Sequence, residues 1–215
     1  MKMKNLFYLF AVAILSLSLI SGCGKKDTAG NKDEKKTEDK KDVSMNENTP
    51  FHLKYEMTDE KGKGTLDMFV KGKNAKMDIK AKEAGQDVAT LMYIKDGMMY
   101  MVMDMMGQKM GMKMDVSKDE NFQKDFAKLY DVKEHLKDYT KGGSEDVLGY
   151  KCDVYTKGAE KIWIYKDMIA LKFTDGKSTL EAKEFEPDAK LADDFFDPPK
   201  DIEFKSMDDL KNLDQ

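Results

Sequence analysis

Apolar and polar residues alternate with a period of two from Phe51 onward, and this alternation restricts the fold more than any other feature. In "FHLKYEMT", polar residues separate Phe51, Leu53 and Tyr55. Successive side chains of a strand point to opposite faces, so such a segment predicts a strand with one apolar face. The short connections "KGKN" and "KDG" carry turn signals, which predict antiparallel pairing. The further segments of this kind are "GTLDMFV", "AKMDIKA", "DVATLMYI", "MMYMVMDMM" and "KMGMKMD".

A helical pattern replaces the alternation after residue 116. Phe122, Phe126 and Leu129 recur at helical spacing in "SKDENFQKDFAKLYD", and Ser117 and Glu120 stand at capping-box spacing. We expect this helix to pack its three apolar side chains into the concave side of the sheet. The next segment, "VKEHLKDY", either extends the helix or forms a second short one.

Strand patterns resume in "EDVLGYKCDVYT", "KIWIYK", "MIALKFT" and "STLEAKEFE". The chain is therefore predicted to be mainly β, with about ten strands and one or two helices. Residues 51–215 have the length of a single domain. After Pro198 and Pro199, which interrupt regular structure, the tail predicts at most a short final helix.

The first 22 residues are typical of an export signal. A charged start, "MKMK", precedes an apolar run from Leu6 to Leu19 that is too short for a stable membrane span. "ISGC" then places Cys23 after two small residues, an arrangement that resembles a bacterial lipobox. We expect cleavage before Cys23, lipidation of its thiol, and attachment to the extracytoplasmic side of the cell membrane. Several acyl chains, palmitate among them, would make that attachment long-lived.

Residues 23–50 are predicted to be a charged, disordered tether between the lipidated cysteine and the domain. Gly24 to Pro50 contains almost no apolar side chain, so it cannot bury enough surface to offset the entropy of ordering.

The charges of the chain argue against nucleic-acid binding. The net charge is −4, and every one of the 37 basic residues is a lysine. Lysine cannot make the planar, bidentate contacts with which arginine reads guanine and grips phosphate. We interpret the mixed lysines and carboxylates as a solvated surface.

Methionine is concentrated in one predicted hairpin. Residues 96–115, "DGMMYMVMDMMGQKMGMKMD", hold nine of the 18 methionines, with a turn expected at Gly107 and Gln108. Strand alternation places seven of these side chains on one face of the hairpin. The first strand contributes Met99, Met101, Met103 and Met105, and the second contributes Met110, Met112 and Met114.

Two interpretations of this hairpin remain open. Thioethers are soft ligands, so Met101, Met103, Met110 and Met112 could hold Cu(I). Methionine is also the adaptable side chain of surfaces that fit variable apolar ligands. A copper site needs only three or four sulfurs, and the hairpin has no histidine. We therefore favour an apolar ligand wall that also includes Phe122 and Phe126, with no cofactor.

The order of these segments resembles the LolA/LolB-type lipoprotein-carrier family. The resemblance rests on "IKDGMMYMVMDMMGQKMGMKMD", the helix from Lys118, "VLGYKCDVYT…KIWIYKDMIALKF" and "DDFFDPPKDIEF", and it covers roughly residues 51–205. It implies a strongly bent, unclosed antiparallel sheet wrapped around a helix, with acyl chains in the hollow. Two features depart from the family: a soluble carrier has no lipid anchor, and here no arginine stands at the mouth. Both argue against shuttling of lipoproteins between membranes.

The sequence contains no recognisable catalytic motif. Neither His52 nor His135 has a nucleophile or carboxylate partner in the sequence, and no zinc or calcium motif occurs. Cys152 has no partner if Cys23 carries lipid. "GYKCDVY" therefore predicts a buried thiol, flanked on its face by Tyr150 and Val154, in preference to an intermolecular disulfide.

These observations favour a non-enzymatic lipoprotein that binds a lipid or another apolar or amphiphilic ligand. The alternatives are a Cu(I) protein of the cell envelope and an interaction partner of another envelope or cell-wall protein.

Overall fold

The computed structural model describes residues 43–60, 62–83, 86–105, 108–127 and 136–206. Eleven strands form one antiparallel series, and a twelfth pairs in parallel with β6. The strands are β1 (Phe51–Asp59), β2 (Gly62–Lys71), β3 (Asn74–Glu83), β4 (Gln86–Lys95), β5 (Met98–Met105), β6 (Gln108–Asp115), β7 (Thr140–Val147), β8 (Tyr150–Lys157), β9 (Glu160–Tyr165), β10 (Ile169–Thr174), β11 (Thr179–Pro187) and β12 (Phe204–Ser206). The predicted fold class, mainly β with an unclosed sheet, is confirmed.

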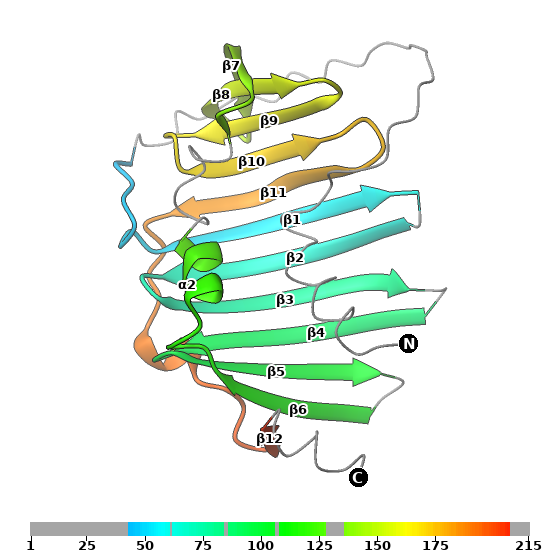
Figure 1. Cartoon of the computed structure of the whole chain (residues 1–215), viewed down its shortest axis with the longest axis vertical. Helices are drawn as coiled ribbons and strands as arrows, with labels where there is room; N and C mark the ends of the chain where they lie inside the picture. The colour runs from blue at the N-terminus through cyan, green and yellow to red at the C-terminus, as the bar shows by residue number, and fades with distance from the viewer. Residues whose placement is uncertain (1–42, 61, 84–85, 106–107, 128–135, 207–215) are drawn as a thin grey trace. The chain divides into compact units, whose positions relative to one another are not determined.

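Two meanders meet in the middle of the sheet. The strand order is β12-β6-β5-β4-β3-β2-β1-β11-β10-β9-β8-β7, so β1 pairs with both β2 and β11 (Figure 1). The turn at Asp96-Gly97 joins β4 to β5 with positive φ at both residues, as its sequence predicts. Because β6 and β7 lie far apart in the strand order, the chain between them has to cross the sheet.

The helix α2 (Glu120–Ala127) lies in this crossing segment. Phe122 and Phe126 are half-buried and pack against the main core, with ring centroids 6.1 Å apart. The predicted packing of these two rings on the sheet is confirmed, whereas Leu129 lies outside the described residues. His135 and most of "VKEHLKDY" also lie outside them.

The predicted capping box is wrong. The carboxylate of Asp119 accepts hydrogen bonds from the backbone N–H groups of Asn121 and Phe122, both at 3.0 Å. The Ser117 hydroxyl instead donates to Asp115 at 2.6 Å. Asp119 therefore caps the helix two residues later than expected, because a carboxylate is an equally good N-cap acceptor.

Two strands differ from those predicted. The segment "EDVLGYKCDVYT" is divided between β7 and β8 by a turn at Leu148-Gly149, where φ is +54° and +78°. In the tail, β12 pairs Phe204 with Gly111 of β6. A Cβ on Gly111 would stand 2.5 Å from the backbone oxygen of Glu203, so this close approach requires glycine.

One main hydrophobic core joins both meanders. Phe51, Leu53, Val70 and Leu171 have no exposed surface, and aromatic side chains from β8, β9 and β11 complete the cluster. Cys152 lies in it, as predicted, with Tyr150 and Val154 also buried. Burial raises the pKa of the Cys152 thiol to about 12, so this thiol is unreactive at neutral pH.

At the N-terminal end of the described chain, residues 43–50 contact the domain. Met45 packs against the main core, and Thr49 is buried. The Thr49 hydroxyl accepts a hydrogen bond from the Asn46 N–H at 2.9 Å.

Candidate functional site

A row of five methionines crosses the sheet from β2 to β6. Each pairs directly with the next in register, and directly opposed residues of antiparallel strands share a face. Leu53 of β1 extends the row at one end. The row consists of Met68, Met77, Met92, Met101 and Met112.

Parallel rows on either side widen this surface. One pairs Ile94, Met99 and Met114, and the other pairs Thr90, Met103 and Met110. We call the whole surface the methionine face; it comprises Thr90, Ile94 and Met68, Met77, Met92, Met99, Met101, Met103, Met110, Met112 and Met114. The hairpin alone suggested only part of it, because Met68, Met77 and Met92 come from strands in which methionine is not concentrated.

Burial decreases towards one corner of the methionine face. Met68, Met77, Met99, Met101 and Met112 are buried, and Met92, Met103 and Met114 are half-buried. Met110 is 45% exposed, and it is the one exposed large hydrophobic side chain in the described part of the chain. The face therefore combines structural core near β2 and β3 with a surface near β5 and β6 that a ligand can reach.

Met105 is the last residue of β5, and Gln108 is the first residue of β6. Met105 pairs with Gln108 through the backbone, but its side chain lies outside the described residues. Gln108 is the first residue of β6, so the prediction that it lies in the turn is wrong. Asp104 pairs with Lys109 and Met105 pairs with Gln108, so the paired strands extend closer to the turn than expected and include Gln108.

The four residues of the copper alternative stand in two opposed pairs. Met101 pairs with Met112, and Met103 pairs with Met110. Opposed pairs have Cβ atoms about 5 Å apart, which lets flexible thioethers from both strands converge. Among the described residues, no group of three or more His, Cys, Asp or Glu side chains is placed to hold a metal ion.

Thr90 is the polar member of the methionine face, and our sequence interpretation missed it. Its side chain is 1% exposed, and within the described chain its hydroxyl has no hydrogen-bond partner. Ile79 and Met103 lie directly opposite it on β3 and β5. The signal in the sequence is that Thr90 shares its side of the strand with Val88, Met92 and Ile94.

A hollow of about 540 Å³ lies at the ends of β2, β3 and β4, with most of its lining on the face opposite to the methionine face. Gly64, Ala81 and Val88 line it, and Val88 precedes Thr90 by two residues on the same side of β4. Gly64 leaves no room for a side chain, because a Cβ there would stand 2.8 Å from the Lys80 backbone oxygen. The rest of the lining consists of Thr65, Ala89 and charged side chains, among them Lys80 and Asp104.

The opposite face of this half of the sheet holds a histidine–carboxylate pair. His52 Nε2 lies 2.6 Å from Asp67 Oδ1, and the imidazole stacks on Phe69 with centroids 4.2 Å apart. The expectation that His52 has no carboxylate partner is wrong, because Asp67 lies on the neighbouring strand β2, 15 residues away in the chain. Phe195 contacts Phe69 from the 3-10 helix η2 (Asp193–Phe196), so the tail covers this side and the pair belongs to a packed surface.

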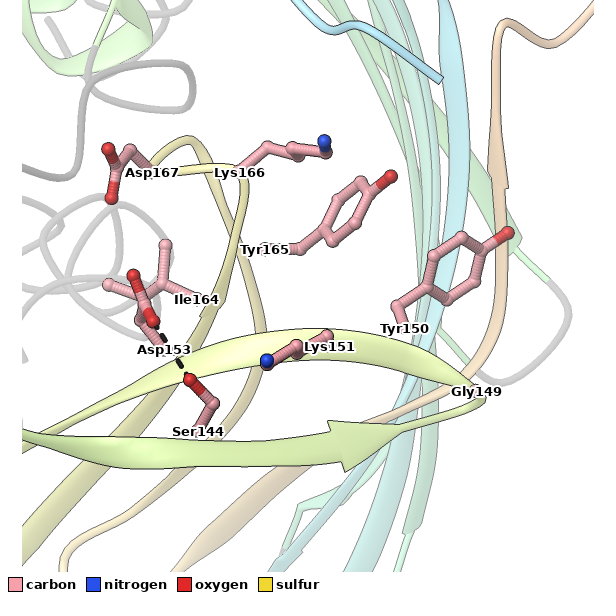
Figure 2. Close-up of a pocket in the computed structure, with 9 residues that line it drawn as sticks. All are labelled: Ser144, Gly149, Tyr150, Lys151, Asp153, Ile164, Tyr165, Lys166 and Asp167. Carbon is pink, nitrogen blue, oxygen red and sulfur yellow. Dashed lines mark hydrogen bonds between the residues drawn. The ribbon is translucent and has the colours of Figure 1, made fainter. Parts of the chain in front are cut away.

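A second hollow, of about 530 Å³, lies between the β7–β8 and β9–β10 turns (Figure 2). Ser144 donates a hydrogen bond to Asp153 at 3.2 Å, and Lys141 contacts the same carboxylate at 2.6 Å. The bond from Lys141 is the main reason why the pKa of Asp153 is lowered. The described residues that line this hollow include no histidine, the base that usually activates a serine nucleophile. The lining comprises Ser144, Gly149, Tyr150, Lys151, Asp153, Ile164, Tyr165, Lys166 and Asp167.

Most of this domain matches the model of a known protein family. Residues 52–197 match the family model described as "Domain of unknown function (DUF4412)". The chain belongs to the DUF4412 family. The matched segment of this DUF4412 chain includes the entire methionine face and the helix α2. A search of curated proteins found no match.

Similarities to solved structures are distant. The DUF4412 chain matches a crystal structure of MucB with 12% identity and a TM-score of 0.36, over 72% of its own length and 58% of that chain. The Pseudomonas aeruginosa MucA/MucB complex gives 13% identity and a TM-score of 0.37, with 71% and 56% covered. A structure of PNGF-II matches with 11% identity and a TM-score of 0.34, over 77% of this chain and 33% of that chain. This chain thus spans between a third and about three fifths of those proteins. Scores this low leave the LolA-type resemblance a hypothesis.

Within the described part of the chain, no helix is both long enough and apolar enough to cross a membrane.

Proposed function

We propose that this protein is a membrane-anchored bacterial lipoprotein that binds an apolar or amphiphilic ligand, such as a lipid, on its methionine face. One observation carries the proposal: the register of β2 to β6 joins the methionines into one continuous surface whose exposure rises towards Met103 and Met110. Flexible thioethers adapt to ligands of variable shape, and an exposed apolar patch of this kind is typical of a binding surface. The helix α2 lies on the same face and supplies Phe122 and Phe126 as part of the wall.

Mass spectrometry tests this proposal directly. The mature protein, purified in mild detergent from a native-like bacterial host, is extracted with organic solvent. We expect stoichiometric lipid in the extract, and a Met103→Lys, Met110→Lys double variant should carry much less. Equal lipid in both proteins would place the ligand elsewhere, and no lipid in either would refute binding.

The anchor is proposed from the lipobox at Cys23. A Cys23→Ser variant should lose the lipid and leave the membrane fraction. Retention in the membrane with unchanged processing would refute the anchor without affecting the ligand site.

Copper binding is the second candidate function, because Met101, Met103, Met110 and Met112 form two facing pairs. Titration with Cu(I) against a competing chelator under anaerobic, reducing conditions separates the two candidates. Leucine at these four positions keeps the bulk and removes the sulfur. Tight binding that disappears in the leucine variant would favour copper. If the methionine face binds lipid, the leucine variant should yield as much lipid on solvent extraction as the wild type.

A third possibility, that the protein docks on another envelope protein, has no specific contact in its favour within the described chain. A pull-down from envelope extracts would test it.

A further inference from the structure

We propose that Thr90 is the specificity-determining residue of the methionine face, donating a hydrogen bond to an ester carbonyl of a diacylglycerol-type lipid. This inference rests on the proposed function, because it names the ligand class of the same site. It starts from a polar atom that the fold leaves unsatisfied: the Thr90 hydroxyl is buried and has no hydrogen-bond partner in the described chain.

Buried polar groups are almost always paired, because leaving one unpaired costs free energy. Valine has nearly the same shape as threonine and would remove this cost at Thr90. A hydroxyl at this position therefore requires a hydrogen-bond partner that the described part of the chain does not supply. The surrounding rows are apolar, with Ile79 on one side and Met103 on the other, so water has few polar contacts to make there.

The geometry around Thr90 suits a ligand with long apolar chains and a polar group near one end. Met103 lies directly opposite Thr90 on β5, and Met92 follows it by two residues on β4. Both are half-buried, and their unbranched thioethers can rotate away to uncover the hydroxyl. The chains of the ligand would then lie along the methionine rows towards Met110 and Met112.

The ligand class follows from a single hydrogen-bond donor among apolar rows. The hydroxyl of Thr90 needs an acceptor, and the methionine rows around it suit acyl chains. An ester carbonyl is the acceptor next to the acyl chains of a glycerolipid, so it can reach Thr90 while the chains stay on the methionine face.

The test compares two probes that differ only in their carbonyl groups. Dioctanoylglycerol carries two ester carbonyls, and 1,2-di-O-octylglycerol has ether linkages in their place. Both are titrated into the full mature chain, and into Thr90→Val, Thr90→Ser and Thr65→Val. Thr65 is the matched control, because it pairs with Glu56 and Lys80 and so lies on the opposite face.

Thr90→Val should weaken dioctanoylglycerol binding by about two- to ten-fold, the value of one hydrogen bond, and leave the ether probe unchanged. Thr90→Ser should keep the wild-type preference for the ester, and Thr65→Val should change nothing. The thermal midpoint of ligand-free Thr90→Val should equal or exceed that of the wild type, which shows that the variant folds. Dioctanoyl phosphatidylglycerol and a dioctanoylglyceryl-cysteine peptide carry the same esters and should show the same loss. Tighter binding of the phosphatidylglycerol would identify a free lipid as the natural ligand. Tighter binding of the peptide would identify a lipidated protein.

Three results would overturn the assignment. If both probes bind the wild type and Thr90→Val binds the ester equally well, Thr90 plays no part in recognition and the proposed function stands. If Thr90→Val weakens both probes equally, the threonine acts through packing. If neither probe binds the wild-type protein, the proposed lipid-binding function fails together with this inference.

Discussion

Met77 and Met110 lie on the same face of the sheet but differ in burial, so truncating each measures whether that face is structural core or accessible surface. Met77 is 6% exposed and belongs to the main core, whereas Met110 is 45% exposed. Met77→Ala should cost about 2–5 kcal/mol of unfolding free energy, the range for a buried methionine. In a domain of this size that lowers the thermal midpoint by about 4–20 °C. Met110→Ala should stay within about 0.5 kcal/mol of the wild type.

Urea unfolding followed by fluorescence provides the assay, because Trp163 is the one tryptophan of the chain and is buried. Met77→Leu is the matched control; it conserves volume and should cost less than about 1.5 kcal/mol. Equal losses for Met77→Ala and Met110→Ala would refute the reasoning. They would show that the corner near β5 and β6 is as firmly packed as the centre and offers no surface to a ligand.

Three further predictions concern the edges of the fold. Gly111→Ala should displace β12, because the added methyl would stand 2.5 Å from the Glu203 backbone oxygen and 2.7 Å from Ile202 Cγ2. Amide hydrogen exchange should then become faster at residues 203–206. Unchanged protection of these amides would contradict the pairing of β12 with β6. Glu145 accepts bonds from Lys161 and from Trp163 Nε1, and chiefly the Lys161 bond holds its pKa below the ordinary value of 4.5. Its stabilising effect is complete above pH 4.5 and is lost as pH falls through the lower, folded-state pKa. Trp163 fluorescence should therefore stay constant down to pH 4.5 and change below it, and a transition at higher pH that Glu145→Gln abolishes would contradict this. Deleting residues 24–42 should leave the thermal midpoint unchanged, whereas deleting 24–50 should lower it by several degrees because Met45 packs on the core; equal midpoints would show that residues 43–50 add nothing.

The alternation of the sequence predicted the strands that are apolar on one side. Phe51, Leu53 and Tyr55 mark β1 by burial at every second position, and the Asp96-Gly97 turn fixes where β4 ends. These features are local, so they can be recognised in the sequence without knowing which strands pair. β7 was not predicted as a separate strand because its residues, "TKGGSEDV", are exposed except Val147 and carry no apolar period. A strand of this kind exists through its hydrogen bonds to β8, which the sequence does not display.

The candidate site was predicted in part for the same reason. The hairpin methionines were visible as a cluster, and the structure places six of them on one face: Met99, Met101, Met103, Met110, Met112 and Met114. Met68, Met77 and Met92 joined them only through the register of β2, β3 and β4, which depends on long-range pairing. The functional assignment of Met99 to Met114, Phe122 and Phe126 as a ligand wall stays a prediction.

The most direct test of the central claim uses the methionine methyl groups themselves. The protein is labelled with carbon-13 at the methionine ε-methyls, each signal is assigned by single Leu substitutions, and dioctanoylglycerol is titrated while the methyl spectrum is recorded. A ligand on the methionine face should shift the signals of Met92, Met103, Met110 and Met114 saturably and leave those of Met68 and Met77, which lie in the buried core, almost unchanged. Saturable binding that leaves all four accessible methyls unperturbed would contradict the account.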